Sequence, residues 1–255
     1  MGEDGGNPAD QPAHRVLLSA FLSDRHEVTN AQFRRFVEAT KYRTDAERIG
    51  RGSIAIGTDW VEAEGASWEH PGGRDSGLEG RENHPVVLVS WNDATVYARW
   101  AGKRLPTEAE FERLLRGGPE GRKYPWGDGE TPPPGSGNLA DGAFLRERPG
   151  KSAFAGYDDG FPELAPVASS SPNGLGLFDI SGNVWEWCSD QFDPSYYASS
   201  PARDPTGPAR GGVRVLRGGA WCEPPPNMRC VVRMPSIPSL RNGRYGFRCV
   251  RGLAE

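Results

Sequence analysis

The sequence contains no apolar run long enough to cross a bilayer, and its N-terminal segment, MGEDGGNPADQPAHR, lacks the basic-then-apolar order of a secretory signal. We therefore expect no membrane span. A cytoplasmic location is the default expectation, and surface display stays open. The chain also lacks a basic excess, because 30 Lys and Arg face 34 Asp and Glu. This balance argues against nucleic acid as a partner.

Cysteine is scarce, and the four cysteines that occur lack metal-binding spacing. No two of them form a CxxC pair, and no histidine lies near them in the sequence, which excludes the usual zinc motifs. Their pairing stays open, since free thiols, one disulfide and two disulfides all fit. The four are Cys188, Cys222, Cys230 and Cys249.

Long periodic segments are few, whereas glycine, proline and aromatic residues are abundant. The chain has Gly 34 and Pro 23 beside Trp 8, Tyr 7 and Phe 10. This composition excludes a helical bundle and indicates irregular backbone around aromatic rings. A length of 255 residues fits a single domain. We expect one loop-rich α+β unit over residues 1–255.

Apolar spacing and capping residues predict three helices. They cover 29–41 behind Thr29, 91–103 behind Ser90, and 107–118, where Thr107 and Glu110 form a capping box. The segments 41–83 and 119–175 show no period and are predicted as loops. So long an irregular stretch needs something else to hold it, and metal ions are the obvious candidate. Strands are predicted at 15–28, 84–90, 177–190, 214–221, 228–234 and 244–252.

Several long motifs occur in an order that resembles one known family. They include SWNDATVYARWAGKRLPTEAE, NGLGLFDISGNVWEWCSD, RVLRGGAW and GFRCVR. Together they resemble the formylglycine-generating-enzyme-like (sulfatase-modifying-factor) domain over roughly residues 1–252. The resemblance implies a C-type-lectin-like fold elaborated with long loops.

The resemblance does not decide the activity, because a fold can serve several functions. In the family's oxidases it implies a Cu(I) ion held by two cysteines five positions apart, which suits a soft monovalent metal. Here Cys222 lies near the first ligand position, but Asn227 stands five positions later. Cys230 matches a structural cysteine of the family better than a ligand. We therefore predict no catalytic residue, no enzymatic activity, and copper as an unlikely cofactor.

Calcium suits the irregular middle of the chain, because Ca²⁺ takes hard oxygen ligands from looped backbone. The resemblance implies two structural Ca²⁺ sites. The first would use Asn138, Leu139, Asp159 and Phe161, and the second Asp179, Gly182, Val184 and Glu186.

The segment 222–245 keeps the family's scaffold residues but shows no chemical theme between them. It resembles the variable region of diversity-generating-retroelement variable proteins, in which asparagine codons become NNC or NNT codons. Only Glu223, Met228 and Met234 in this segment lie outside what such codons encode. Exposed positions tolerate varied side chains at little cost in stability. The predicted variable surface comprises Trp221, Cys222, Pro224, Pro225, Asn227, Val232, Pro235, Ser236, Ile237, Ser239, Leu240, Asn242, Gly243, Arg244 and Tyr245.

The sequence thus predicts a non-enzymatic protein that binds a protein or other macromolecular ligand through residues 222–245 on a calcium-stabilised scaffold. Two alternatives stay open. One is a formylglycine-generating or related copper-dependent oxidase. The other is a catalytically inactive paralogue that binds sulfatase-like proteins.

Overall fold

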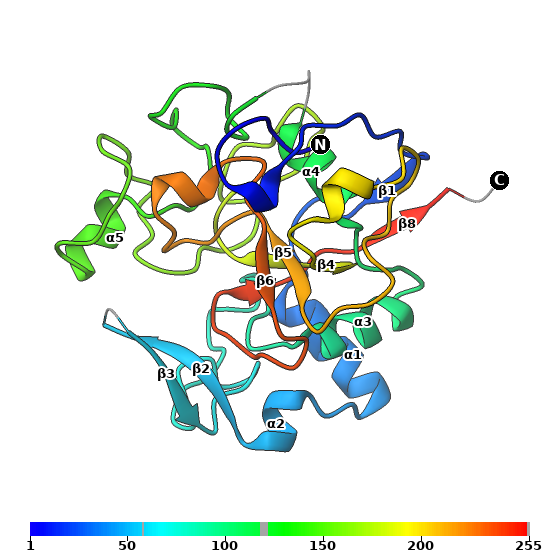
Figure 1. Cartoon of the computed structure of the whole chain (residues 1–255). Helices are drawn as coiled ribbons and strands as arrows, with labels where there is room; N and C mark the ends of the chain where they lie inside the picture. Colours follow the sequence, from blue (N-terminus) through cyan, green and yellow to red (C-terminus); the bar gives the residue numbers. More distant parts are fainter. Residues whose placement is uncertain (58, 118–121, 254–255) are drawn as a thin grey trace.

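Short helices precede most of the strands in the computed structural model, which describes residues 1–57, 59–117 and 122–253 (Figure 1). The described helices are α1 (Asn30–Thr40), α2 (Asp45–Ile49), α3 (Trp91–Trp100), α4 (Glu108–Arg116) and α5 (Gly142–Glu147), with 3-10 turns at Pro8–Asp10, Tyr196–Ser199 and Pro225–Met228.

Local capping determines where the three longest helices begin. Thr29, Ser90 and Thr107 each accept a hydrogen bond from the backbone N–H three residues later, as predicted. The helix expected at 107–118 ends at Arg116, and Gly117 closes it in the left-handed conformation with φ 56°. Residue 118, the expected end, lies outside the described residues.

A four-stranded sheet with the order β6-β5-β4-β7 forms the centre of the fold. β4 is antiparallel to β5 and parallel to β7, and α4 packs against β4 and β5. Two further pairs, β1-β8 and β2-β3, lie outside this sheet. The strands are β1 (Phe21–Ser23), β2 (Arg51–Ile56), β3 (Asp59–Glu64), β4 (Trp185–Gln191), β5 (Arg214–Arg217), β6 (Met234–Ser236), β7 (Tyr245–Gly246) and β8 (Val250–Gly252).

Four sequence predictions about secondary structure are wrong. The strand predicted at 228–234 is instead the end of a 3-10 turn and a loop, and β6 begins only at its last residue, Met234. The segment 41–83 is not a loop throughout, because it contains α2 and the β2–β3 hairpin. The loop predicted at 119–175 contains α5. The segment 84–90 is buried but forms no strand. Its backbone bonds instead to scattered partners, with Val86 N donating to Val28 O and Leu88 N to Asn242 O.

Aromatic rings fill the main core between α1, α3 and the central sheet. Phe33 packs edge-on against Phe36 and Trp68 at 5.3 Å between ring centroids, and Tyr97 lies 5.3 Å from Phe247. A second cluster lies between α4 and strands β4 and β5 and contains Phe111. These clusters agree with the aromatic-rich interior that the composition predicts. No helix of the described residues is long and apolar enough to span a membrane.

Candidate functional site

A pocket of about 160 Å³ forms where four segments that are distant in the sequence meet. The β2–β3 hairpin contributes Trp60, and α5 contributes Phe144. The segment after β5 contributes Trp221 and Cys222, and Arg244 enters from just before β7. The pocket therefore exists only once the hairpin, α5 and the central sheet have assembled.

Aromatic rings form much of the wall of this pocket. Trp221 is buried, and its ring lies 5.9 Å from Phe144 and 6.4 Å from Trp60. The Arg148 guanidinium covers Trp221 at 4.7 Å from the ring centroid. Arg148 is itself held by an ion pair of 2.6 Å with Glu163. The Trp221 indole N–H has no hydrogen-bond partner among the described residues.

Cys222 is the cysteine that reaches this pocket. It is half-buried, whereas the other three cysteines are buried, and all four are free thiols. Burial raises the pKa of Cys222 to about 11, and the nearby Arg244 guanidinium opposes that increase. Arg244 Nη1 lies 4.0 Å from the Cys222 sulfur. The thiol form dominates at neutral pH, next to a cation that would stabilise a thiolate.

Glu223 fixes the backbone that carries Cys222. One carboxylate oxygen accepts hydrogen bonds from Trp185 Nε1 at 2.9 Å and from Arg244 Nη1 at 2.5 Å. The other accepts from Asn227 Nδ2 at 2.7 Å. Asn227 is thus engaged in holding the loop.

The cysteines do not assemble a two-thiolate copper centre. Cys222 packs against the main aromatic core. Cys230 is fully buried in the second cluster, where its N–H donates to Lys123 O at 2.9 Å. The residues present therefore do not fit the copper site that the family resemblance implies, and we assign no step to copper.

The structure brings together the four residues predicted for the first calcium site. Leu139 N and Phe161 N each donate to a carboxylate oxygen of Asp159 at 2.8 Å. Asn138 is buried, and its Oδ1 has no partner among the described residues. Asn138 and Asp159 line one cavity of about 220 Å³. Burial raises the pKa of Asp159 to about 7. An orphaned amide oxygen beside a half-buried carboxylate fits a hard cation.

The residues predicted for the second calcium site lie on one stretch but are already engaged. Glu186 is fully buried and pairs with Arg248 at 2.7 Å. The Asp179 carboxylate accepts from Ser170 Oγ at 2.7 Å. Gly182 has φ 81° and lies so close to Asn138 O that a Cβ there would sit 2.0 Å from it, so only glycine fits. Val184 is fully buried.

Glu27 is a further carboxylate near Asp179 and Glu186 of the second predicted calcium site, and the sequence analysis missed it. It is fully buried, and one of its carboxylate oxygens has no partner among the described residues. Burial, followed by the charges of Asp179 and Glu186, raises its pKa well above the ordinary value. With Arg248 as the neighbouring cation, the three carboxylates carry two surplus negative charges when all are ionised. The only signal in the sequence was an acid directly before the apolar Val28.

Side chains alone do not complete either calcium site. In the part of the chain that the structure describes, no group of three or more His, Cys, Asp and Glu side chains could hold a metal ion. Main-chain carbonyls would have to supply most ligands, as the predicted sites require of Leu139, Phe161, Gly182 and Val184.

The predicted variable surface is only partly at the surface. Pro235 and Ile237 are exposed, whereas Trp221, Ser236, Asn242 and Tyr245 are buried. The buried side chains cannot vary freely, because the interior is close-packed. Half-buried positions are Cys222, Pro224, Pro225, Asn227, Val232, Ser239, Leu240, Gly243 and Arg244.

Curated relatives cover nearly the whole chain. The formylglycine-generating enzyme of Streptomyces coelicolor is 47% identical over 96% of this chain and 82% of its own length. A protein of Bos taurus named inactive C-alpha-formylglycine-generating enzyme 2 is 36% identical over 99% and 84%.

The prediction of a non-enzymatic protein is wrong. Relatives 35–47% identical over 94–98% of this chain are named as an enzyme. The prediction rested on one missing cysteine position, whereas the likeness to the enzymes extends across the scaffold.

Solved structures confirm the predicted fold of the formylglycine-generating-enzyme and C-type-lectin-like type. PvdO from Pseudomonas aeruginosa matches with a TM-score of 0.76 at 27% identity, covering 99% of this chain and 90% of its own. Treponema denticola variable protein 1 matches with a TM-score of 0.61 at 23% identity, covering 99% and 91%, which concerns the fold alone. A family model, the sulfatase-modifying factor enzyme 1-like domain, matches residues 1–253. The chain therefore belongs to the formylglycine-generating-enzyme and sulfatase-modifying-factor family.

Proposed function

We propose that this chain is an enzyme that oxidises the cysteine side chain of a peptide or protein, and that the pocket beside Cys222 receives the reacting thiol. The observation that carries this proposal is the position of Cys222, the cysteine that opens into the pocket. The names of the relatives supply the reaction class.

The chain's own residues would bind and orient the substrate. Trp60, Phe144 and Trp221 exclude water from the thiol and favour its desolvated approach to Cys222. Arg244 stabilises negative charge that develops on sulfur. Cys222 and Arg244 belong to the segment 222–245, so the macromolecular partner would contact this segment at the pocket.

The test is turnover of a cysteine-containing peptide in air, with and without added Cu(I). Converting the CH2–SH group to an aldehyde removes two electrons, takes an oxygen atom from water and releases hydrogen sulfide. Dioxygen is the electron acceptor supplied, and it is reduced to hydrogen peroxide. Thiol loss and hydrazide capture of the aldehyde are measured by mass spectrometry. We expect Cys222→Ser to lower the rate at least about tenfold, and Cys230→Ala to retain it because Cys230 lies outside the pocket.

Two outcomes would count against the proposal. Equal rates for the wild type and Cys222→Ser would exclude this pocket as the site. No turnover by the folded wild type in either metal condition would exclude the activity, and would place the chain functionally with the relative named inactive.

We also propose that Ca²⁺ stabilises the irregular middle of the chain. The orphaned oxygen of Asn138 beside Asp159 supports the first site. The surplus buried charge of Glu27, Asp179 and Glu186 supports the second. Both sites would act as structural ties between loops, since the catalytic pocket has other lining residues.

A further inference from the structure

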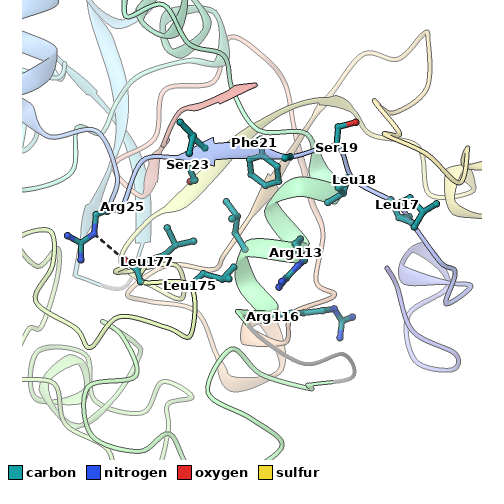
Figure 2. A pocket seen from close by; sticks show the side chains of 15 residues that line it. Leu17, Leu18, Ser19, Phe21, Ser23, Arg25, Arg113, Arg116, Leu175 and Leu177 are labelled. Atoms are coloured by element: carbon teal, nitrogen blue, oxygen red, sulfur yellow. Dashed lines mark hydrogen bonds between the residues drawn. The ribbon is translucent and has the colours of Figure 1, made fainter. Parts of the chain in front are cut away.

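A groove of about 940 Å³ shares no lining residue with the Cys222 pocket. One wall is the extended segment 16–23, and the opposite wall is α4 with the loop 175–177. Figure 2 shows Phe21 of β1 facing the groove, with Arg113 and Arg116 of α4 and Leu175 across from it.

Apolar side chains are exposed in this groove to an unusual degree. Leu17 is 60% exposed, Leu22 48% and Leu175 43%. Isolated exposed leucines are ordinary, but three on one concave surface mark a contact site.

The charged residues of the groove are all cationic. Arg25, Arg113 and Arg116 line it, and no carboxylate does. Glu112 neutralises Arg116 through a contact of 2.9 Å. Arg25 lies over the Phe178 ring at 5.1 Å, without a carboxylate partner among the described residues. The exposed Arg113 side chain has no hydrogen bond or ion pair within the described part of the chain. The groove therefore carries unneutralised positive charge.

A free strand edge lies beside these arginines. β1 pairs only with β8 in a two-stranded sheet of the described residues, so its second edge has no strand neighbour. Such an edge is a template for an added strand. β1 itself would accompany about three residues of an extended peptide, or about 10 Å. The backbone of Leu17, before β1, already pairs with Ala202 and Asp204.

We propose that this groove binds an extended acidic peptide segment of a partner protein as an added strand beside β1. Apolar side chains of the peptide would cover Leu17, Leu22 and Leu175, and its carboxylates would pair with Arg113 and Arg25. The inference is independent of the Cys222 pocket and of its chemistry.

The probe is a fluorescent octapeptide of alternating leucine and glutamate, with blocked ends, measured by anisotropy against the full chain at low salt. We expect binding that weakens as salt is added. Arg113→Glu should weaken it at least about tenfold. Leu22→Ser should weaken it by several fold through lost apolar contact. Arg99→Glu is the matched control, because Arg99 is an exposed helical arginine outside the groove.

Modified probes test the mode of binding. A peptide N-methylated at alternate residues should lose binding if backbone pairing is used, and a lysine-leucine peptide should not bind. Equal affinity of the wild type and Arg113→Glu, or no binding by the folded wild type, would overturn the proposal. Binding to phosphatidylglycerol vesicles without binding to the peptide would overturn it in favour of a membrane surface.

Discussion

Asp190 is a buried carboxylate that the fold keeps close to neutral. It is 2% exposed, and burial, with Glu108 as the next cause, raises its pKa from 3.8 to about 7. Its Oδ2 accepts hydrogen bonds from Glu108 N at 3.0 Å and from Ser189 Oγ at 2.9 Å. A raised folded-state pKa means that the folded protein binds the proton more tightly than the unfolded chain. The stabilisation from Asp190 is therefore full below pH 4 or so and falls as the pH rises to about 7.

We predict that Asp190→Asn gains stability relative to the wild type as the pH rises. The amide stays neutral and keeps an oxygen for Glu108 N. The difference in free energy of unfolding should shift by roughly 2–4 kcal/mol in favour of the variant between about pH 4 and about pH 8. Urea unfolding at both pH values measures it.

Asp193→Asn is the matched control for this prediction. Asp193 is accessible to solvent, and hydrogen bonds from Ser195 lower its pKa. A group whose pKa is lowered by folding stabilises the fold at pH values above its unfolded pKa, and this stabilisation is lost only as the pH falls through the folded pKa. The difference in free energy of unfolding between Asp193→Asn and the wild type should therefore stay constant between about pH 5 and about pH 8. Parallel pH profiles for Asp190→Asn and the wild type would contradict the argument.

At the scale of elements, α4 begins with a capping box and carries two carboxylates that form buried ion pairs. Thr107 Oγ1 accepts from Glu110 N, and Glu110 Oε2 accepts from Thr107 N at 2.8 Å. The helix then presents Glu108 to Arg233 at 2.6 Å and Glu112 to Arg217 at 2.7 Å. Because these carboxylates are buried, the start of the helix determines whether both ion pairs form.

We predict that Thr107→Ala lowers the free energy of unfolding by about 1 kcal/mol, because the capping hydrogen bond is lost. Thr107→Ser keeps the hydroxyl and should retain most of the stability. The urea unfolding midpoints of the two variants, each compared with the wild type, measure these losses of stability. Equal losses in both would attribute the effect to the threonine methyl group and refute the capping argument.

Such local signals explain which elements the sequence predicts correctly. The capping boxes at Thr29, Ser90 and Thr107 lie within four residues, so the helix starts are visible without tertiary contacts. The β2–β3 hairpin escapes prediction because its mostly exposed second strand carries charged residues and lacks an apolar alternation. The opposite error occurs at 84–90, where a continuous apolar run looks like a strand. Burial alone explains that run, because its backbone pairs with no ladder.

At the scale of the whole molecule, contacts between distant segments create the parts of the site that the sequence hides. Asn138 and Asp159 could be proposed from the family's motif, and the structure brings them together. Trp60, Phe144 and Trp221 converge from three segments, which no spacing in the sequence reveals. Glu27 lies beside Asp179 and Glu186 although it is far from them in the sequence. Its carboxylate accepts a hydrogen bond of 3.1 Å from Nδ2 of Asn183, 156 positions later.

Adding and removing divalent cations tests whether Ca²⁺ stabilises the irregular loops, because Asn138 and Glu27 each have a buried oxygen without a partner among the described residues. We predict that a chelator lowers the melting temperature and that Ca²⁺ restores it. A ligand at about one hundred times its Kd adds about 2.7 kcal/mol, which corresponds to roughly 5–10 °C for a chain of this size. Differential scanning calorimetry measures the change, and Mg²⁺ should restore less because it demands a more regular octahedron.

Variants distinguish Ca²⁺ binding by the carboxylates Glu27, Asp179 and Glu186 from a general effect of salt on stability. Glu27→Gln removes one of the surplus charges, so the response to Ca²⁺ should shrink while the calcium-free protein gains stability from the loss of buried repulsion. Glu69→Gln is the control, because Glu69 is exposed and does not line the cavity that contains Asn138 and Asp159. An unchanged Ca²⁺ response in Glu27→Gln would remove Glu27 from the site. No response in the wild type would show that hydrogen bonds and buried ion pairs alone hold the loops, with Asn138 Oδ1 left unsatisfied at a cost of about 1–3 kcal/mol.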